Sequence, residues 1–403
     1  MASLAHAQPA PVAAGPAMRP LDRTVAILAL LLLAAAALYA GNVVSLKNGA
    51  LVLVGSLLGV ALYHAAFGFT GGWRAFVTER RSASLRAQLL LLALATVLMV
   101  PVIAFGEVLG RPVNGFATPI GVPLVAGAFL FGLGMQLGGG CGSGTLFTVG
   151  GGSARMVVTL LAFIAGSMLG VAHAPAWSGL PSFGTFSLWQ QFGVLPTLAL
   201  SLLALAGLAY LAARAEQRRT GKLVPLGWSG GATPRLLTGP WPLLWGAVAL
   251  ALLSLVTLLV AGHPWGITGA FALWGAKGLA ALGVDVASWD SWSGTGARAQ
   301  LEGSLFAHPI SAMDIGLILG AMIAASLAGR FGPKVDLRLG SLVAAVLGGL
   351  LMGYGARMSS GCNIGALLGG IASGSLHGWI WFGTAFLGSL VGIRLRPLFR
   401  LNG

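Results

Sequence analysis

The chain has 403 residues, of which 57% are apolar without counting its 63 glycines, and only 8% are charged. This excludes a soluble globular protein, in which about 25% of residues carry charge, and it excludes a disordered chain, which needs low hydrophobicity and high charge. The sequence therefore predicts an all-α integral membrane protein that crosses the bilayer many times.

Residues 1–23 are rich in Ala and Pro and are expected to form a disordered cytoplasmic N-terminus. Apolar segments of roughly 20 residues, the length that spans a bilayer as a helix, follow from residue 24 onward. The first is longer than the apolar region of a signal peptide, so it is expected to be retained. We predict ten transmembrane helices, at about 24–44, 49–67, 87–105, 119–137, 155–173, 193–213, 243–262, 310–329, 339–357 and 376–394.

The segment 263–283 is broken by Pro264 and several glycines, and its path decides the topology. If it re-enters the membrane without crossing, all but five of the 23 Lys and Arg residues lie on one side. Because positively charged loops stay in the cytoplasm, we predict a protein of the bacterial inner membrane with both termini cytoplasmic. The loop 174–192 and the segment 263–309 are then external, and the basic loop 214–241 is cytoplasmic. The net charge of +14 reflects this topology, so no nucleic-acid partner is expected.

Three motifs of the first half recur in the same order in the second half, which indicates an internal repeat. The pairs are His64, Gly68 and Thr70 with His263, Gly266 and Thr268, then Cys141 with Cys362, and finally Gly166 and Gly170 with Gly388 and Gly392. The repeats are expected at 24–173 and 193–403. Each holds five predicted helices, an odd number, so the two units face opposite ways. Such inverted repeats are common in transporters, whose solute path runs between them near the middle of the membrane.

Two Gly-rich segments, 137–153 and 359–375, are predicted to be re-entrant loops that meet inside the membrane. Eight of the 17 residues of the first are glycine, too many for a helix interior, and the segment is too apolar for a surface loop. Short helices with inward N-termini would favour an anion; the alternative is that the glycines serve only helix packing. The residues expected to line the path are Gly140, Cys141, Gly142 and Gly144 from the first loop and Gly361, Cys362, Asn363 and Gly365 from the second.

The two cysteines are expected to act as neutral thiols that donate hydrogen bonds to a soft, sulfur-containing solute. The alternatives are a small buried apolar residue at each position, or a disulfide that would plug the path. Two cysteines are too few for a disulfide scaffold or a Cys-only zinc site. We expect no catalytic residues, no metal site and no cofactor, because the chain has no HExxH, CxxC or Walker-type motif.

Few other polar residues are expected inside the membrane. Arg357 and Lys277 are candidates to attract an anion, although a snorkelling interfacial arginine would explain Arg357 equally well. His64 and His263 open the first pair of repeated motifs and are expected to form interfacial hydrogen bonds rather than bind a ligand. Asp314, at the start of the eighth predicted helix, is expected to pair with a basic neighbour and is given no role in proton coupling.

The stretches GGGCGSG, SSGCNIG and HPWGITGAFALWGAK resemble the YeeE/YedE family of bacterial inner-membrane sulfur-transport proteins over about residues 49–400. The resemblance implies a helical fold with inverted internal symmetry and uptake of thiosulfate, relayed between cysteine thiols that match Cys141 and Cys362. It departs from thiosulfate-importing members at Gly68, where those members have a further Cys in a stretch resembling FCFTAAFRD. No sulfur-carrier domain follows Gly403, so any acceptor in the cytoplasm is expected to be a separate sulfur-carrier protein.

The leading hypothesis is therefore transmembrane uptake of a small sulfur-containing compound, with thiosulfate as the first candidate. One alternative is a channel for another small anion or for a selenium or sulfur species. Another is a membrane subunit of a thiol–disulfide redox system. An enzyme is not expected, because the apolar segments offer almost no general acid–base groups.

Overall fold

The computed structural model describes residues 22–108, 110–227, 236–332 and 338–401. Most of the predicted disordered N-terminus, 1–23, therefore lies outside the described residues. Within them, ten helical segments are long and apolar enough to cross a membrane, and each coincides with one of the ten predicted helices. This part of the prediction is confirmed.

The transmembrane segments are built from long helices, several of which continue into a short one. They are α1 (Arg23–Tyr39) with the π-helical η1 (Ala40–Val44); α2 (Leu46–His64) with α3 (Phe69–Glu79); α4 (Ala83–Phe105); α5 (Val122–Gly138) with α6 (Gly142–Gly150); α7 (Ala154–Ala172); α10 (Val194–Thr220); α11 (Leu243–Ala261); α14 (Pro309–Leu327); α15 (Leu339–Met358) with the π-helical η5 (Asn363–Gly369) and α16 (Gly370–Ala372); and α17 (Leu376–Leu395) with η6 (Arg396–Phe399).

Short elements connect these segments. They are the paired strands β1 (Glu107–Val108) and β2 (Arg111–Pro112), the helices α8 (Ala174–Ser178), α9 (Leu188–Phe192), α12 (Thr268–Ala281) and α13 (Thr295–Glu302), and the 3-10 turns η2 (Val286–Ser288), η3 (Asp290–Trp292) and η4 (Leu305–Ala307). The helix α12 occupies the segment predicted not to cross. Its 14 residues extend about 21 Å, less than the roughly 30 Å of a hydrocarbon core.

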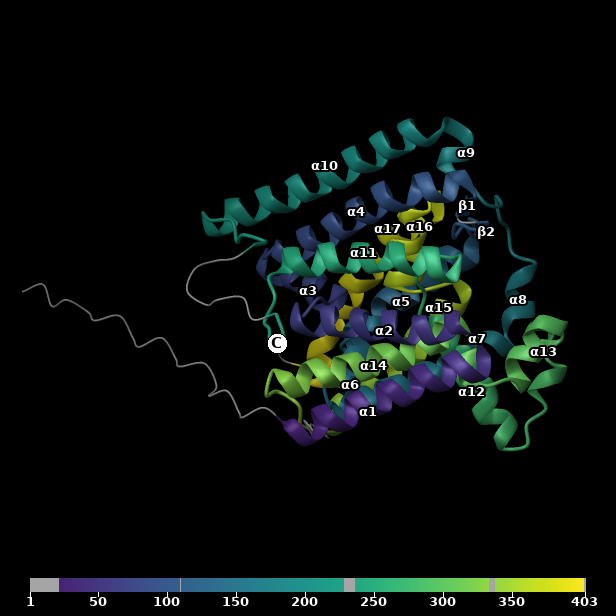
Figure 1. The fold of residues 1–403 in the computed structure, drawn as a ribbon. Coiled ribbons are helices and arrows are strands. Elements are labelled where there is room, and N and C mark those ends of the chain that lie inside the picture. Colours follow the sequence, from purple (N-terminus) through teal and green to yellow (C-terminus); the bar gives the residue numbers. More distant parts are fainter. Residues whose placement is uncertain (1–21, 109, 228–235, 333–337, 402–403) are drawn as a thin grey trace, which may run out of the picture.

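Each half of the chain packs mainly against the other half rather than against itself (Figure 1). Helix pairs with extensive contacts include α2 with α14, α7 with α15, α5 with α17 and α4 with α11, and α5 packs on α15 at the centre. Suppose that α2, α4, α5 and α7 of the first half are equivalent, in that order, to α11, α14, α15 and α17 of the second half. Exchanging equivalent helices then turns the pair α2–α14 into α4–α11, turns α7–α15 into α5–α17, and leaves α5–α15 unchanged. This is the packing expected of two repeats related by a two-fold axis.

Glycines bring the paired helices into backbone contact. A Cβ atom added to Gly55 of α2 would lie 2.1 Å from the carbonyl oxygen of Met313 in α14, and one added to Gly320 would lie 1.9 Å from that of Ser56. Cβ atoms on Gly166 and Gly388 would likewise lie 2.3 and 2.1 Å from backbone oxygens of the facing helices. Small residues of this kind drive helix association in lipid, where hydrophobic burial contributes little.

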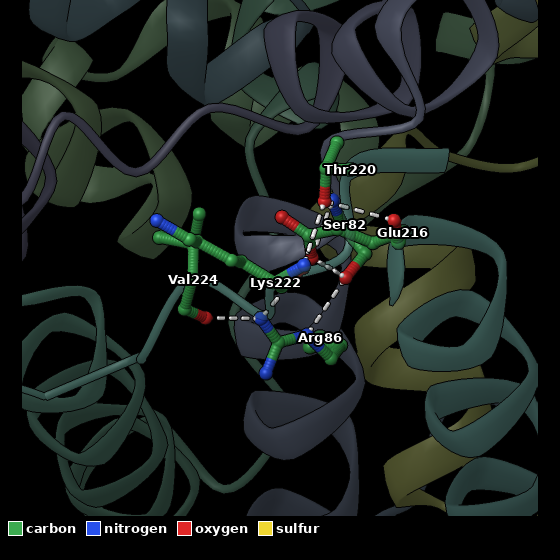
Figure 2. A network of polar contacts seen from close by, with 6 residues as sticks. All are labelled: Ser82, Arg86, Glu216, Thr220, Lys222 and Val224. Atoms are coloured by element: carbon green, nitrogen blue, oxygen red, sulfur yellow. Dashed lines mark hydrogen bonds and ion pairs between the residues drawn. The ribbon is translucent and has the colours of Figure 1, made fainter. Parts of the chain in front are cut away.

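The long helix α10 lies at the edge of the bundle and packs mainly on α4 (Figure 1). Near its C-terminal end the buried carboxylate of Glu216 accepts hydrogen bonds from the backbone N–H of Ser82, from the Ser82 hydroxyl and from the Arg86 guanidinium, as Figure 2 shows. Arg86 also donates to the carbonyl of Val224. The predicted helix ended at residue 213, and this polar cluster accompanies its continuation to Thr220.

Candidate functional site

Both cysteines are at the start of a short helix in the interior of the protein. Cys141 is the N-terminal cap of α6, and Cys362 holds the same position before η5. Each follows a left-handed residue, Gly139 or Ser360, that ends or follows the preceding long helix and turns the chain back. The two side chains are 1% and 0% exposed and are free thiols. The prediction that these Gly-rich segments are not helical was wrong for most of their residues, because 142–150 forms α6 and 363–372 forms η5 and α16. Around each cysteine the non-helical backbone is confined to a few residues.

The two loops touch each other at Gly142 and Cys362. A Cβ atom added to Gly142, the first residue of α6, would lie only 3.2 Å from Sγ of Cys362 and 3.3 Å from a methyl carbon of Ile267. Since Ile267 precedes α12, the N-termini of α6, η5 and α12 come together around this thiol. Helix N-termini present unpaired N–H donors and partial positive charge, so the arrangement suits an anion.

Each thiol has one weak local partner. The sulfur of Cys141 lies 3.4 Å from the hydroxyl oxygen of Ser143, and the sulfur of Cys362 accepts a bond from the backbone N–H of Ile364, also at 3.4 Å. The Cys362 thiol therefore keeps its own S–H available as a donor. A neutral thiol is a weak donor and a soft, polarizable group, which matches it to sulfur more closely than to a hard oxyanion oxygen.

The glycines predicted to line the path differ in the space beside them. A Cβ atom on Gly365 would meet nothing within 4 Å, and one on Gly144 would meet only the Cys141 sulfur, at 3.6 Å. In contrast, a Cβ on Gly140 would lie 2.9 Å from the Met156 methyl, and one on Gly361 would lie 2.7 Å from a backbone nitrogen of its own loop. Gly142, Gly144 and Gly365 thus adjoin a thiol or open space, whereas Gly140 and Gly361 are packed against protein.

Several buried polar side chains near the loops have unused hydrogen-bonding capacity. Asn363, directly after Cys362, is fully buried, and neither its amide nitrogen nor its amide oxygen has a partner. The same holds for the indole N–H of Trp265, two residues before Ile267, and for both carboxyl oxygens of Asp314. Buried polar groups are almost always paired in folded proteins, so each of these atoms needs a partner that the chain does not supply.

The sequence singled out Asn363, but Trp265 and Asp314 were not among the predicted site residues. For Asp314 the signal was present, because an acid inside an apolar segment is a functional candidate by default. The basic neighbour predicted for it is absent among the described residues, where the two ion pairs are Arg81 with Glu79 and Arg86 with Glu216. For Trp265 the sequence offers no signal, since an indole in a membrane protein is ordinarily an interfacial anchor.

The first pair of repeated motifs opens the helices α3 and α12. Gly68 has an extended backbone with φ of −120°, and a Cβ atom there would meet nothing within 4 Å. The buried Thr70 accepts a bond from the Gln136 amide on its carbonyl oxygen at 3.2 Å, and its own hydroxyl has no partner. In the second copy of the motif, a Cβ atom on Gly266 would lie 3.0 Å from the Ile310 side chain. Thr268 is the first residue of α12.

Four of the residues predicted to belong to the site make their contacts away from the two thiols. His64 packs on the Trp241 ring with centroids 5.5 Å apart, and the His263 ring donates to the carbonyl of Pro264 at 2.9 Å. Lys277 donates to two carbonyls at the end of α13, and burial lowers its pKa. Arg357 is exposed on α15, with its stem against Gly170 of α7. Roles for these four in attracting or admitting an anion remain predictions.

The ten membrane-length helices are those of a polytopic membrane protein, and the family and the names of similar proteins indicate a transporter rather than an enzyme. The family model described as "Sulphur transport" matches residues 64–391, and the chain belongs to this family.

Similar proteins bear related names. The chain is 32% identical over 167 residues to "Probable transporter YedE" of Escherichia coli, an alignment that covers 40% of each chain, so it spans about two-fifths of that relative's length. It is 27% identical over 356 residues to "Thiosulfate transporter TsuA" of Spirochaeta thermophila, covering 82% of this chain and 93% of the relative. Identity to the E. coli TsuA is 25% over 350 residues, covering 84% and 91%.

Proposed function

We propose that the chain takes up a small sulfur-containing compound, thiosulfate first, through a central path between its two Gly-rich loops. Cys141 and Cys362 act as neutral thiol donors on this path. The observation that carries the proposal is the approach of Gly142 to Cys362, with a Cβ position 3.2 Å from the sulfur. It makes the two cysteine loops one site, although the cysteines are separated by more than half of the chain.

The chemistry of the solute fits the groups at this site. Thiosulfate has a soft terminal sulfur and hard oxygens, so it needs soft contacts at one end and N–H donors at the other. Neutral thiols offer the first, and the N-termini of α6, η5 and α12 offer the second. Thiolates would repel the anion, and a buried charge without a partner is costly, so transport requires that both thiols stay protonated.

Asn363 provides the polar contact beside Cys362. Its side-chain nitrogen is free to donate to an oxygen of the solute, which would satisfy a buried donor that is otherwise unpaired. Gly365, with open space beside it, leaves room for the solute on the same loop. Gly68 replaces the further Cys of thiosulfate-importing relatives, so in this chain the relay has two thiols.

The proposed setting is the bacterial inner membrane, with both termini cytoplasmic and a separate cytoplasmic sulfur-carrier protein as acceptor. The basic loops favour this orientation. The names of the two TsuA relatives, which align over more than nine-tenths of their length, support thiosulfate as the first solute to test. A different small anion or a selenium species remains the outcome to expect if thiosulfate is not carried.

The test is uptake of labelled thiosulfate by the purified protein in liposomes. We expect Cys141→Ser and Cys362→Ser each to lower uptake at least about tenfold, because a hydroxyl is smaller and harder than a thiol and the loss of one contact of about 1.4 kcal/mol is tenfold. Ser326→Ala is the matched control, since it removes a buried hydroxyl that bonds only to its own helix.

Two further measurements distinguish the thiol relay from a thiol–disulfide redox cycle and from transport of another solute. Full uptake by the double Ser variant would overturn the role of the cysteines. A thiol–disulfide redox cycle instead requires that alkylation of the denatured protein detect fewer than two free thiols after turnover, whereas the relay keeps both thiols free. Competition by sulfite, sulfate and selenite identifies the solute if thiosulfate itself does not cross.

A further inference from the structure

Asp314 is a buried acid without a partner. It lies in the second turn of α14, a helix that packs against α1, α2, α6 and α12, and its side chain is 0% exposed. Neither carboxyl oxygen accepts or donates a hydrogen bond, and none of the described Lys or Arg side chains forms an ion pair with it. Nothing in the packing of the protein accounts for an acid at this position.

The contacts of α14 place Asp314 between the start of the α12 region and the end of α6. It is four residues after Ile310 and four before Ile318, so the three share one face of the helix. Ile310 contacts the start of the α12 region, where a Cβ on Gly266 would lie 3.0 Å from it, and the carbonyl of Ile318 lies against Gly150 at the end of α6. Gly266 precedes Ile267, which lies with Cys362 against Gly142, so Asp314 is one helical turn from a residue that adjoins the thiol site.

The charge state of Asp314 therefore affects the free energy of an anion bound at Cys362. An ionised carboxylate buried without a cation or a donor is strongly disfavoured, while the neutral carboxyl costs far less. A carboxylate would also repel an anion bound at the neighbouring thiol through a medium of low dielectric. The anion and an ionised Asp314 thus exclude each other, whereas the anion and a protonated Asp314 are compatible.

We propose that Asp314 is the proton-carrying group of the path, so that a sulfur anion and one proton cross the membrane together. This inference rests on the proposed function. A proton from the external water binds one carboxyl oxygen, and the neutral carboxyl permits the anion to occupy the thiol site. The anion then leaves to the cytoplasm, and cytoplasmic water accepts the proton and hydrates the carboxylate that remains. The proton cancels one negative charge of the solute, which lowers the work of moving an anion into a cell that is negative inside.

Other titratable groups around Asp314 do not replace it. On α6 and η5 they are the thiols Cys141 and Cys362, and on α12 the ammonium of Lys277, which is bonded to two carbonyls. The helices α1 and α2 carry such groups only at their ends, at Arg23, Tyr39, Lys47, Tyr63 and His64, and η4 carries none. His308 caps α14, and burial, helped by the nearby His263, lowers its pKa to about 4, so it stays neutral near neutral pH.

The experiment measures the accumulation of labelled thiosulfate in liposomes whose membrane voltage is held at zero. With the wild-type protein, the ratio of internal to external thiosulfate should rise about tenfold for each pH unit by which the outside is more acidic, because one coupled proton contributes 1.4 kcal/mol per unit. Asp314→Asn should lose this rise and equilibrate to a ratio near one, while it still exchanges thiosulfate across the membrane. Asp314→Glu should keep the coupling, and so should the control Asp290→Asn, which changes an exposed acid.

Each outcome decides between the two proposals. Wild-type exchange of thiosulfate without any response to the pH gradient, or unchanged coupling in Asp314→Asn, overturns the role of Asp314 and leaves the proposed function intact. Absence of thiosulfate exchange in the wild type overturns the proposed function and this inference with it. If Asp314→Asn does not fold, Asp314→Ser, which also removes the carboxyl group, takes its place, and coupling that persists in that variant overturns the role of Asp314.

Discussion

The two cysteine loops occupy equivalent positions in the repeats but differ in their chemistry. After Cys141 come Gly142 and Ser143, and the α6 helix is regular and closely packed. After Cys362 come Asn363 and Ile364, the helix is π-helical, and it carries an unpaired amide next to open space at Gly365. π-helical turns are rare and frequent at functional sites. From this comparison we predict that the first loop closes the proposed site and that the second loop binds the solute.

The largest loss of thiosulfate uptake is expected when a side chain is added where the two loops touch. Gly142→Ala places a methyl group 3.2 Å from the Cys362 sulfur and 3.3 Å from Ile267, so either α6 or the thiol must move. We expect thiosulfate uptake to fall by more than about tenfold, because the neighbouring groups must give way by a few tenths of an ångström where a thiol is positioned for the solute. Liposome uptake measures it.

The matched control is on the other loop. Gly365→Ala adds the same methyl group where no atom lies within 4 Å, so uptake should fall much less than in Gly142→Ala. Equal losses for the two variants would contradict the division of roles between the loops.

A smaller effect is expected from the polar groups that follow the thiols. Asn363→Ala removes the unpaired amide, so uptake should fall about tenfold, the value of one hydrogen bond to a charged group. The melting temperature should not fall, because the amide has no partner in the protein to lose. Ser143→Ala, the counterpart in the first loop, should change uptake less than threefold or so, since it removes only a weak contact to a thiol. A larger loss in Ser143→Ala than in Asn363→Ala would reverse the assignment.

The smallest effect is expected at Gly68, where the family resemblance fails. Gly68→Cys fits without strain, because the residue has a negative φ and open space at its Cβ position. We expect normal folding and uptake that is unchanged or raised severalfold, as a third thiol would extend the relay. Uptake and thermal unfolding of the variant measure both. Loss of folding would mean that Gly68 is required by the backbone, and its match to the family's further Cys would then carry no information about the solute.

The sequence was sufficient for the transmembrane helices, whereas the segments that it predicted to be Gly-rich loops are largely helical. Long apolar runs and the glycine density around each Cys are local signals, and the structure confirms the ten helices that they predict. The contact of Gly142 with Cys362 could not be predicted, because it depends on how two distant segments approach in space. The predicted partner of Asp314 was wrong for the same reason, since the residues that face a helix are decided by packing.

The interlocking of the two halves also sets the order in which the protein can be assembled in the cell. The main partner of α7, which ends at Ala172, is α15, which begins only at Leu339. During synthesis the first five helices therefore enter the membrane well before their partners exist. Contacts so distant in sequence form slowly. The native bundle can form only after α17 has been made, so a chain truncated before that helix would insert into the membrane but lack its transport site.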